Sequence, residues 1–286
     1  MIMIRLSAFA DESDNSLEGQ IAGLKRNGIS LLEIRNINGK NVMELTDEEA
    51  KAIRARLDEE GIKVWSIGSP IGKKDINLSE EEHLADAKRG CELAHILGAN
   101  NIRCFSFYNV VDDATHAKML DLLKKFVAIG NENGVKMCHE NDKGLYGDNL
   151  SRTKDVLDNT PGLYYVYDPA NFLQVGEKSA DTIAELAGRA FYFHIKDVVA
   201  ETGELVPAGY GDGNIKGLVG GIKDDKVLTI EPHLKIFGGY VLNDKTVLKT
   251  KFHFETNVEA FDAACAAIKK VLTEVGYVEK EGAFVK

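Results

Sequence analysis

The chain has 286 residues, of which 44% are hydrophobic, and its 45 acidic and 35 basic side chains give a formal net charge of −10. This length and apolar content support one large α/β domain or two ordinary ones. The acidic balance argues against a broad nucleic-acid or anionic-membrane surface, since both need clustered lysine and arginine. We therefore expect a small molecule as the partner.

The first residues and the cysteines indicate where the protein acts. The opening MIMIRLSAF is followed directly by the acidic ADESD, which leaves too short an apolar run for a signal peptide. No stretch of about 18 apolar residues could span a bilayer. The cysteines form no C-x-x-C pair for zinc or redox exchange, so we expect reduced, mostly buried thiols. These features predict a soluble, cytoplasmic protein.

Helix ends that pass directly into strands recur along the first half of the chain. Each contains a glycine suited to the turn after a helix, followed by residues that favour extended backbone. The four segments are NGISLLEIR (27–35), EGIKVWSIG (60–68), LGANNIRCFSF (97–107) and NGVKMCHEN (133–141). Helix starts are marked as well, because Thr46 with Glu49 and Ser79 with Glu82 fit S/T-x-x-E capping boxes.

Eight strand candidates follow from this pattern. They begin near Ile4, Leu31, Lys63, Asn101, Val135, Tyr164, Phe191 and Val227. The last four advance by about 31 residues, which is a plausible length for a strand and helix. Eight such units in about 250 residues match a (β/α)8 TIM barrel. A doubly wound sheet is the main alternative, but it would normally carry a glycine fingerprint where this chain has ADESDNS. We predict an α/β TIM barrel, with residues 1–286 as a single domain.

Two late segments break the regular pattern. VPAGYGDGNIKGLVGGIKDD (206–225) leaves room for only a short helix between glycines. KIFGGYVLNDKTVLKTKFHFE (235–255) alternates like a hairpin around Asn243 and Asp244, before a final helix from about Asn257 to Val275. We interpret the second segment as an insertion after strand eight, at the active-site end of the barrel.

Ligand-type side chains end the last four predicted strands, and these residues are Glu140, Asp168, His194 and Glu231. In a TIM barrel, the carboxyl ends of the strands face one shared bowl. Three carboxylates around one imidazole would repel one another without a cation, so the pattern predicts one bound divalent metal. The oxygen-rich set favours Mn²⁺, and Mg²⁺, Co²⁺ or Zn²⁺ would also fit.

Each of these residues could also serve the fold and bind no metal. A single histidine in an apolar strand is more often a hydrogen-bonded core residue, and glutamates at strand ends often form salt bridges. An aspartate before Pro169 could simply start a turn. Four successive strands ending this way nevertheless favour convergent metal ligands.

Residues next to these ends are candidates for other roles. Lys196 should point to the same interior as His194, where it could steady an oxyanion or offset the acidic charge. Asp197 should point the other way and orient a neighbouring loop. His139 should face away from Glu140, in a packing or supporting role.

The remaining wall of the bowl has weaker candidates. Arg35 and Glu33 end the second strand, and Trp65, Ser66 and Ser69 lie on the third. Aromatic faces and hydroxyl groups are typical of sugar sites, although Trp65 could equally belong to the core. His233, two residues beyond Glu231, is a candidate for substrate contact. If the substrate carried a phosphate, we would expect it near Lys73, Lys74 and Arg103.

Five motifs in the second half resemble the xylose-isomerase-like TIM barrels of the sugar phosphate isomerase/epimerase family, part of the apurinic endonuclease family 2 superfamily. They are HEN with KGLYGD (139–148), YDPAN (167–171), FHIKD (193–197), VPAGYGDG (206–213) and IEPH (230–233). The first half matches only in its repeat. The resemblance implies that Glu140, Asp168, His194 and Glu231 bind one metal, and that Glu140 and Glu231 exchange protons with an enediolate.

Two positions depart from the family pattern. Ketose epimerases commonly have a substrate-binding histidine three residues after the sixth-strand aspartate, and this chain has Asn171 there. Asparagine can hydrogen-bond a hydroxyl but cannot act as an acid near neutral pH. Tyr210 stands where relatives often have glutamate in the glycine-rich motif.

The sequence thus predicts a divalent-metal-dependent isomerase or epimerase of a small sugar or sugar derivative, working through a metal-stabilised enediolate. The alternative is a dehydratase or lyase that uses the same site on an oxo-sugar or oxo-inositol. A DNA-repair endonuclease is disfavoured because it would need several metals, and therefore many histidine ligands. This chain has 7 histidines, mostly on predicted helices or loops, and no basic stripe. The complete ligand set disfavours a non-catalytic sugar-binding module. A homo-oligomer is compatible with the sequence.

Overall fold

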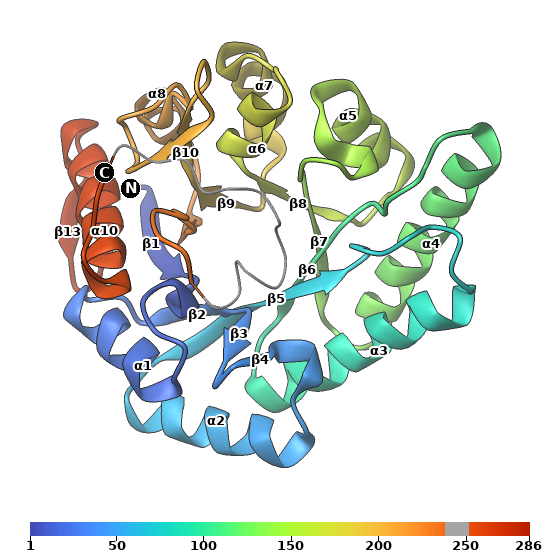
Figure 1. Cartoon of the computed structure of the whole chain (residues 1–286), viewed down its shortest axis with the longest axis horizontal. Coiled ribbons are helices and arrows are strands. Elements are labelled where there is room, and N and C mark those ends of the chain that lie inside the picture. The colour runs from blue at the N-terminus through green and yellow to red at the C-terminus, as the bar shows by residue number, and fades with distance from the viewer. Residues whose placement is uncertain (238–251) are drawn as a thin grey trace.

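Eight parallel strands form a closed ring at the centre of the computed structural model, which describes residues 1–237 and 252–286. Around the ring the strands are β1 (Met3–Ala8), β2 (Leu31–Ile34), β5 (Lys63–Ile71), β6 (Asn101–Cys104), β7 (Lys136–Glu140), β8 (Tyr164–Tyr167), β9 (Tyr192–Ile195) and β12 (Lys226–Ile230). Parallel pairing of β12 with β1 closes the ring, which Figure 1 shows end-on. The predicted TIM barrel is confirmed.

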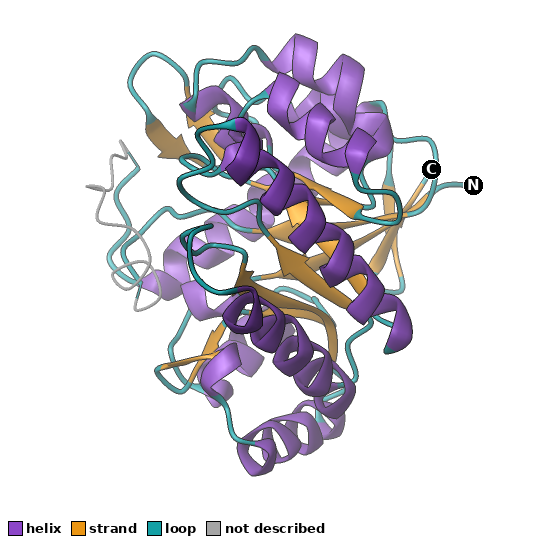
Figure 2. Cartoon of the chain, turned by 90° about the vertical axis from the view of Figure 1, so that its right-hand side faces the viewer, coloured by secondary structure: helices purple, strands orange, loops and turns teal. Residues whose placement is uncertain are grey.

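Helices surround the ring on the outside (Figures 1 and 2). They are α1 (Leu17–Arg26), α2 (Asp47–Glu59), α3 (Glu80–Leu97), α4 (Asp113–Glu132), α5 (Leu150–Asn159), α6 (Pro169–Gln174), α7 (Ser179–Leu186), α8 (Ile215–Gly220) and α10 (Asn257–Glu274). Short 3₁₀ helices add η1 (Ala10–Glu12), η2 (Val42–Glu44), η3 (Tyr146–Asp148) and η4 (Ala187–Arg189). The predicted short helix in segment 206–225 is confirmed as α8. No helix in the described residues is long and apolar enough to cross a membrane.

Local sequence signals account for the helix boundaries. Both predicted capping boxes are present, with Thr46 at the start of α2 and Ser79 at the start of α3. Each hydroxyl accepts a backbone N–H that the first helical turn would leave unsatisfied. Gly98 ends α3 at φ 73°, a left-handed conformation that glycine adopts without steric cost.

Shorter strands lie outside the ring. They form the pairs β3 (Asn36–Ile37) with β4 (Lys40–Asn41), β10 (Asp197–Val199) with β11 (Glu204–Val206), and β13 (Val278–Lys280) with β14 (Ala283–Val285). Because β14 pairs antiparallel with β1, the two termini lie side by side in Figure 1. The hairpin predicted around Asn243 and Asp244 lies outside the described residues.

The barrel interior changes character along its axis. Alternate side chains of each strand point inward, so residues two apart occupy successive layers. The layer near the amino-terminal ends is apolar, and its members are Leu31, Cys138, Val166, Tyr192 and Val227. Two residues further along the same strands, the side chains are polar or charged, and they are Glu33, Glu140, Asp168, His194 and Thr229. Along each of these strands, the inward-facing side chains therefore change from the apolar core to the polar site within two residues.

Candidate metal centre

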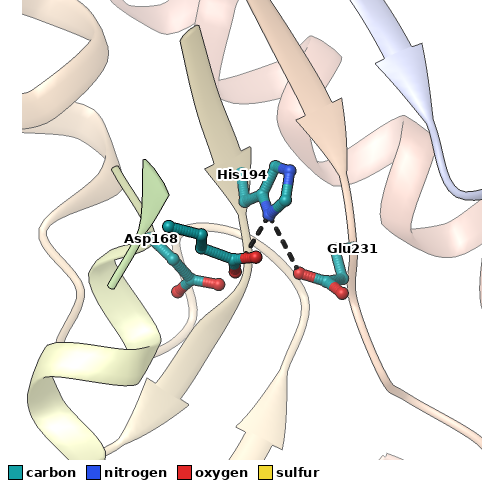
Figure 3. A group of neighbouring side chains, drawn as sticks. Asp168, His194 and Glu231 are labelled. Carbon is teal, nitrogen blue, oxygen red and sulfur yellow. Dashed lines mark hydrogen bonds and ion pairs between the residues drawn. The ribbon is translucent and has the colours of Figure 1, made fainter. Parts of the chain in front are cut away.

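Glu140, Asp168, His194 and Glu231 meet at the carboxyl end of the barrel, and we call them the ligand cluster. Each contributes one nitrogen or oxygen atom to a group whose atoms all lie within 4.8 Å of one another. All four side chains are buried. Figure 3 shows His194 pointing toward the carboxylates, with Asp168 and Glu231 on either side. The structure thus brings together the four residues that the strand ends predicted.

His194 occupies the centre of this arrangement. Its Nδ1 lies 3.1 Å from Glu140 Oε1 and 3.2 Å from Glu231 Oε2. The ring packs edge-on against Phe9 and Tyr192, which fixes its plane. Burial alone would lower the pKa of His194, but the surrounding carboxylates, Glu140 foremost, raise it well above its usual value. The nitrogen that faces the cluster is therefore in a strongly negative environment.

Asp168 is placed by the chain around it. It caps α6, where Oδ1 accepts the backbone N–H of Asn171 at 3.0 Å. The Asn141 side chain bridges to the Asp168 backbone in both directions, accepting its N–H and donating to its carbonyl oxygen. Burial raises the pKa of Asp168 to about 6, although Lys196 acts in the opposite direction. Sequence analysis gave Asn141 no role, although it is part of the HEN motif.

Lys196 points into the cluster, as the alternation along its strand predicted. Its Nζ lies 2.8 Å from Asp168 Oδ2 and 3.5 Å from Glu231 Oε2. Burial would raise the pKa of Glu231, but the charges of Lys196 and His194 hold it well below its usual value. Lys196 thus offsets part of the acidic charge.

Each glutamate of the cluster has an arginine on its outer side. Arg103 donates to Glu140 Oε2 at 3.0 Å, and Arg35 donates to Glu231 Oε1 at 2.8 Å. Both guanidinium groups lie over the ring of Phe9. The two carboxylates are therefore held alike, with one oxygen toward an arginine and the other toward His194.

These arginines hold protein groups already. Arg103 also donates to the carbonyl oxygens of Gly68 and Ser69, and Arg35 forms a bidentate pair with Asp11. Lys73 and Lys74 pair with Asp142 and Asp86. Lys73, Lys74 and Arg103 therefore already contact acids or carbonyl oxygens, and their role in binding a phosphate, if the substrate carries one, stays a prediction.

Asp11 and Glu12 belong to the site but were missed in the sequence. They form part of η1, directly after β1, and both are buried against Arg35. The sequence signal was the acidic run ADESD at the end of the first strand. Polar residues at the carboxyl end of a barrel strand face the shared bowl, as was argued for strands five to eight.

His233 lies beside Glu12, as part of the second group that could hold a cation. Its Nε2 is 3.4 Å from Glu12 Oε1 and 3.5 Å from Glu231 Oε1, and its backbone N–H donates to Glu12 Oε2 at 2.8 Å. Glu12, Glu231 and His233 are this second group. Arg35 lies within it, so a cation would have to displace an existing ion pair.

Asn171 supports the cluster as well as facing it. Its amide donates to the Asn141 carbonyl oxygen at 2.9 Å and to Glu140 Oε1 at 3.3 Å. It therefore positions Glu140. Its predicted contact with substrate remains a prediction.

Trp65 lies at the opposite end of the barrel, so the prediction that it lines the bowl is wrong. It packs against the apolar amino-terminal layer, stacks on Phe191 and carries Arg5 over its ring. Trp65 lies too early in β5 to reach the carboxyl rim. Trp65 is therefore part of the core, which was the alternative interpretation of this residue.

The predictions for His139 and Asp197 agree with the structure. His139 is buried and packs next to Gly147, where a Cβ atom would lie 2.7 Å from its Cε1. Asp197 accepts backbone N–H groups from Gly209, Gly211 and Gly213. One buried carboxylate therefore shapes the loop that follows β11.

The cluster fits a divalent cation. Asp168 Oδ2 and Glu231 Oε2 are buried, and their polar contacts among the described residues are ion pairs with Lys196 and His194. A divalent cation would balance the remaining negative charge of the three carboxylates. The donor set of three carboxylates and one imidazole suits Mn²⁺, Mg²⁺, Co²⁺ or Zn²⁺. Glu140, Asp168, His194 and Glu231 would hold it.

The sequence pattern of one family, the xylose isomerase-like TIM barrel, matches residues 21–237. The chain belongs to this family. The match spans β2 to β12 and so includes all four members of the ligand cluster. No curated protein sequence matches the chain.

Solved structures with a similar fold include enzymes of more than one reaction type. The IOLI protein, solved with a zinc atom, has a TM-score of 0.73 at 15% identity, covering 95% of this chain and 99% of its own. D-psicose 3-epimerase from Clostridium cellulolyticum H10, solved with D-tagatose, has a TM-score of 0.72 at 12% identity, covering 95% and 99%. The probable 3-DHS dehydratase AsbF from Bacillus anthracis has a TM-score of 0.70 at 13% identity, covering 93% and 98%. At these identities the likeness shows the fold.

Proposed function

We propose that this family member is a divalent-metal-dependent isomerase or epimerase of a small sugar or sugar derivative. The observation that carries the proposal is the buried ligand cluster, whose four donor atoms lie within 4.8 Å of one another. When bound, the cation, for which we favour Mn²⁺, would polarise a substrate carbonyl and acidify the adjacent C–H.

Glu140 and Glu231 are the acid/base pair in this proposal. Their matched environments support the assignment, since each has one oxygen toward His194 and the other toward an arginine. Arg103 and Arg35 hold the two carboxylates in place and limit their rotation. One glutamate removes the proton beside the carbonyl, and the other returns a proton to the enediolate. General acid–base catalysis of this kind contributes typically 10²–10⁴-fold.

Other residues have supporting roles in the proposal. Lys196, held between Asp168 and Glu231, places a positive charge where negative charge develops on the substrate oxygen. Asn171 and His233 offer hydrogen bonds to hydroxyl groups at the edge of the cluster. Because Arg35 and Arg103 already hold carboxylates, we expect a polyhydroxylated carbonyl compound without a phosphate.

A dehydratase or lyase on an oxo-sugar or oxo-inositol is the second candidate. Both reactions begin with removal of a proton next to a carbonyl, and they differ only in whether a β-group then leaves. The similar folds include an epimerase and a probable dehydratase, so the fold is compatible with either.

Proton exchange distinguishes these candidates. The purified protein, loaded with Mn²⁺, would be incubated in D₂O with a panel of ketoses, and deuterium incorporation next to the carbonyl would be followed by NMR. We expect exchange with at least one ketose and none with Asp168→Asn. Loss of water or of an aglycone from oxo-inositols or 3-oxo-glycosides, without ketose exchange, would establish the second candidate. No exchange and no elimination across both panels would reject the proposed function.

Cation binding provides a test that does not depend on substrate. A ligand that binds only the folded protein at 100 times its Kd stabilises the protein by about 2.7 kcal/mol. We expect Mn²⁺ to raise the melting temperature of the chelator-treated protein, and Asp168→Asn to remove most of that rise. We also expect the protein to act in the cytoplasm, as its free, buried cysteines suggest.

A further inference from the structure

Glu33 is a buried carboxylate beneath the ligand cluster, and it is not one of the cluster's members. It lies on β2 in the barrel interior, its side chain is fully buried, and Leu31 of the apolar layer is two residues before it. Sequence analysis placed it on the wall of the bowl. A fully buried carboxylate is costly unless several donors satisfy it, so its partners indicate its role.

Three donors from two other strands converge on Glu33. Oε2 accepts from the Thr229 hydroxyl at 2.8 Å and faces His194 Nε2 at 3.2 Å. Oε1 accepts from the Tyr192 hydroxyl at 2.8 Å, and that hydroxyl lies 3.3 Å from Ser66 Oγ. Glu33 is therefore held on both oxygens and has little freedom to turn.

Carboxylates face both ring nitrogens of His194, and the contact with Glu33 determines which nitrogen keeps its proton when a cation binds the other. An ionised carboxylate can only accept hydrogen bonds, so Nε2 must carry the proton. The other nitrogen, Nδ1, then faces Glu140 and Glu231 at 3.1 Å and 3.2 Å. When a cation takes the place of the Nδ1 proton, the ring becomes neutral, Nε2–H donates to Glu33 and Nδ1 is directed at the cation.

We propose that Glu33 is a positioning residue that holds His194 in the Nε2–H form, with Nδ1 directed into the ligand cluster. This assignment rests on the proposed function, because it concerns the same cation site. Glu33 acts through His194 and does not touch the substrate. The Tyr192 and Thr229 hydroxyls fix the carboxylate, and Ser66 supports Tyr192 from one step further away.

The test measures cation affinity in place of turnover. Co²⁺ binding to the chelator-treated protein would be followed by its visible absorption and by calorimetry. Removal of such a supporting hydrogen-bond partner typically lowers metal affinity 10–100-fold. We expect a loss in that range for Glu33→Gln, because the neutral amide no longer favours a protonated Nε2. Ser66→Ala is the matched control, since it removes the outer hydroxyl without touching Glu33 or His194, and we expect less than about a twofold change.

A second variant and an NMR measurement separate positioning from loss of fold. Glu33→Asp keeps the charge but withdraws the acceptor from Nε2, and we expect it also to bind Co²⁺ at least about tenfold more weakly. In the Zn²⁺-loaded protein, the Nε2 proton of His194 should give a slowly exchanging signal that exchanges faster in Glu33→Asp. Wild-type affinity in either folded Glu33 variant would overturn the positioning role alone. Failure of the unmodified protein to bind Co²⁺ would overturn the proposed function and this assignment together.

Discussion

The two ends of the barrel interior use the same strands in opposite ways. At the amino-terminal end, Leu31, Cys138, Val166, Tyr192 and Val227 pack with Trp65 and Phe191, and we call these residues the amino-terminal plug. At the carboxyl end the same strands and their neighbours supply the charged ligand cluster. The plug gains stability from close packing, whereas the cluster holds like charges together at a cost. The candidate site and the closely packed plug therefore lie at opposite ends of one axis, as is general for TIM barrels.

Glu140→Gln should give the largest effect and should affect only the carboxyl end. We expect proton exchange with substrate to fall by about 10²–10⁴-fold, because an amide cannot remove a proton. The free energy of unfolding should change much less, because glutamine can still accept from Arg103 and the loss of one buried negative charge offsets part of the lost ion pairing. Deuterium exchange and urea unfolding measure the two quantities. A large loss of stability with retained exchange would contradict the division between the two ends.

Trp65→Ala is the reciprocal change at the amino-terminal plug. Because Trp65 is half-buried against Phe191 and Tyr192, we expect unfolding to become easier by about 2–3 kcal/mol, somewhat below the range for a fully buried aromatic. The rise in melting temperature on adding Mn²⁺ should be retained, since the cluster is unchanged. Calorimetric melting with and without Mn²⁺ measures both. Loss of substrate binding in a folded Trp65→Ala would restore the original prediction for this residue.

Asp197→Asn should lower the free energy of unfolding by a smaller amount. Asp197 lies between the ligand cluster and the loop that follows β11. An amide has one acceptor oxygen where the carboxylate uses both, so at least one of the N–H groups of Gly209, Gly211 and Gly213 loses its partner. We expect a loss of about 1–3 kcal/mol. Asp212→Asn is the control, because that side chain is on the same loop but exposed. Hydrogen exchange of the loop amides would locate the change, and equal protection in both variants would contradict it.

The smallest effect concerns a surface charge far from both ends. Asp262 on α10 accepts from Arg26 and Asn27. Although partial burial acts in the other direction, these hydrogen bonds hold its pKa below the usual value. Its contribution is thus present above about pH 4 and lost as the pH falls through the lowered pKa.

Asp262→Asn should therefore cost about 0.5 kcal/mol at pH 7, since the pair is partly exposed and screened by solvent. The difference from the unmodified protein should disappear in strong acid. Urea unfolding at several pH values and at low and high salt measures this. A difference that grew on acidification would show that the ion pair is not its source.

The carboxyl end was more predictable than the amino-terminal plug, and the reason is periodicity. Side chains alternate along a strand, so a polar residue after an apolar run indicates the rim of a parallel barrel. That argument placed Glu140, Asp168, His194 and Glu231, and the capping boxes placed α2 and α3. Trp65 was misplaced because its residue type suits both a sugar site and a core. Only the position of Trp65 near the start of β5 distinguishes a core residue from a residue of the site.

By itself, the sequence determined the strand and helix order, the closed barrel and the four strand-end residues of the ligand cluster, because these depend on local pattern and chain geometry. The tertiary structure alone decided the contacts between strands. Arg103 and Arg35 were shown to hold Glu140 and Glu231, and Glu33 to hold His194, across the barrel. These pairs join residues far apart in the sequence, and their distances depend on how the ring closes. No periodicity encodes that closure, so the partner of each charge could be found only in the folded chain.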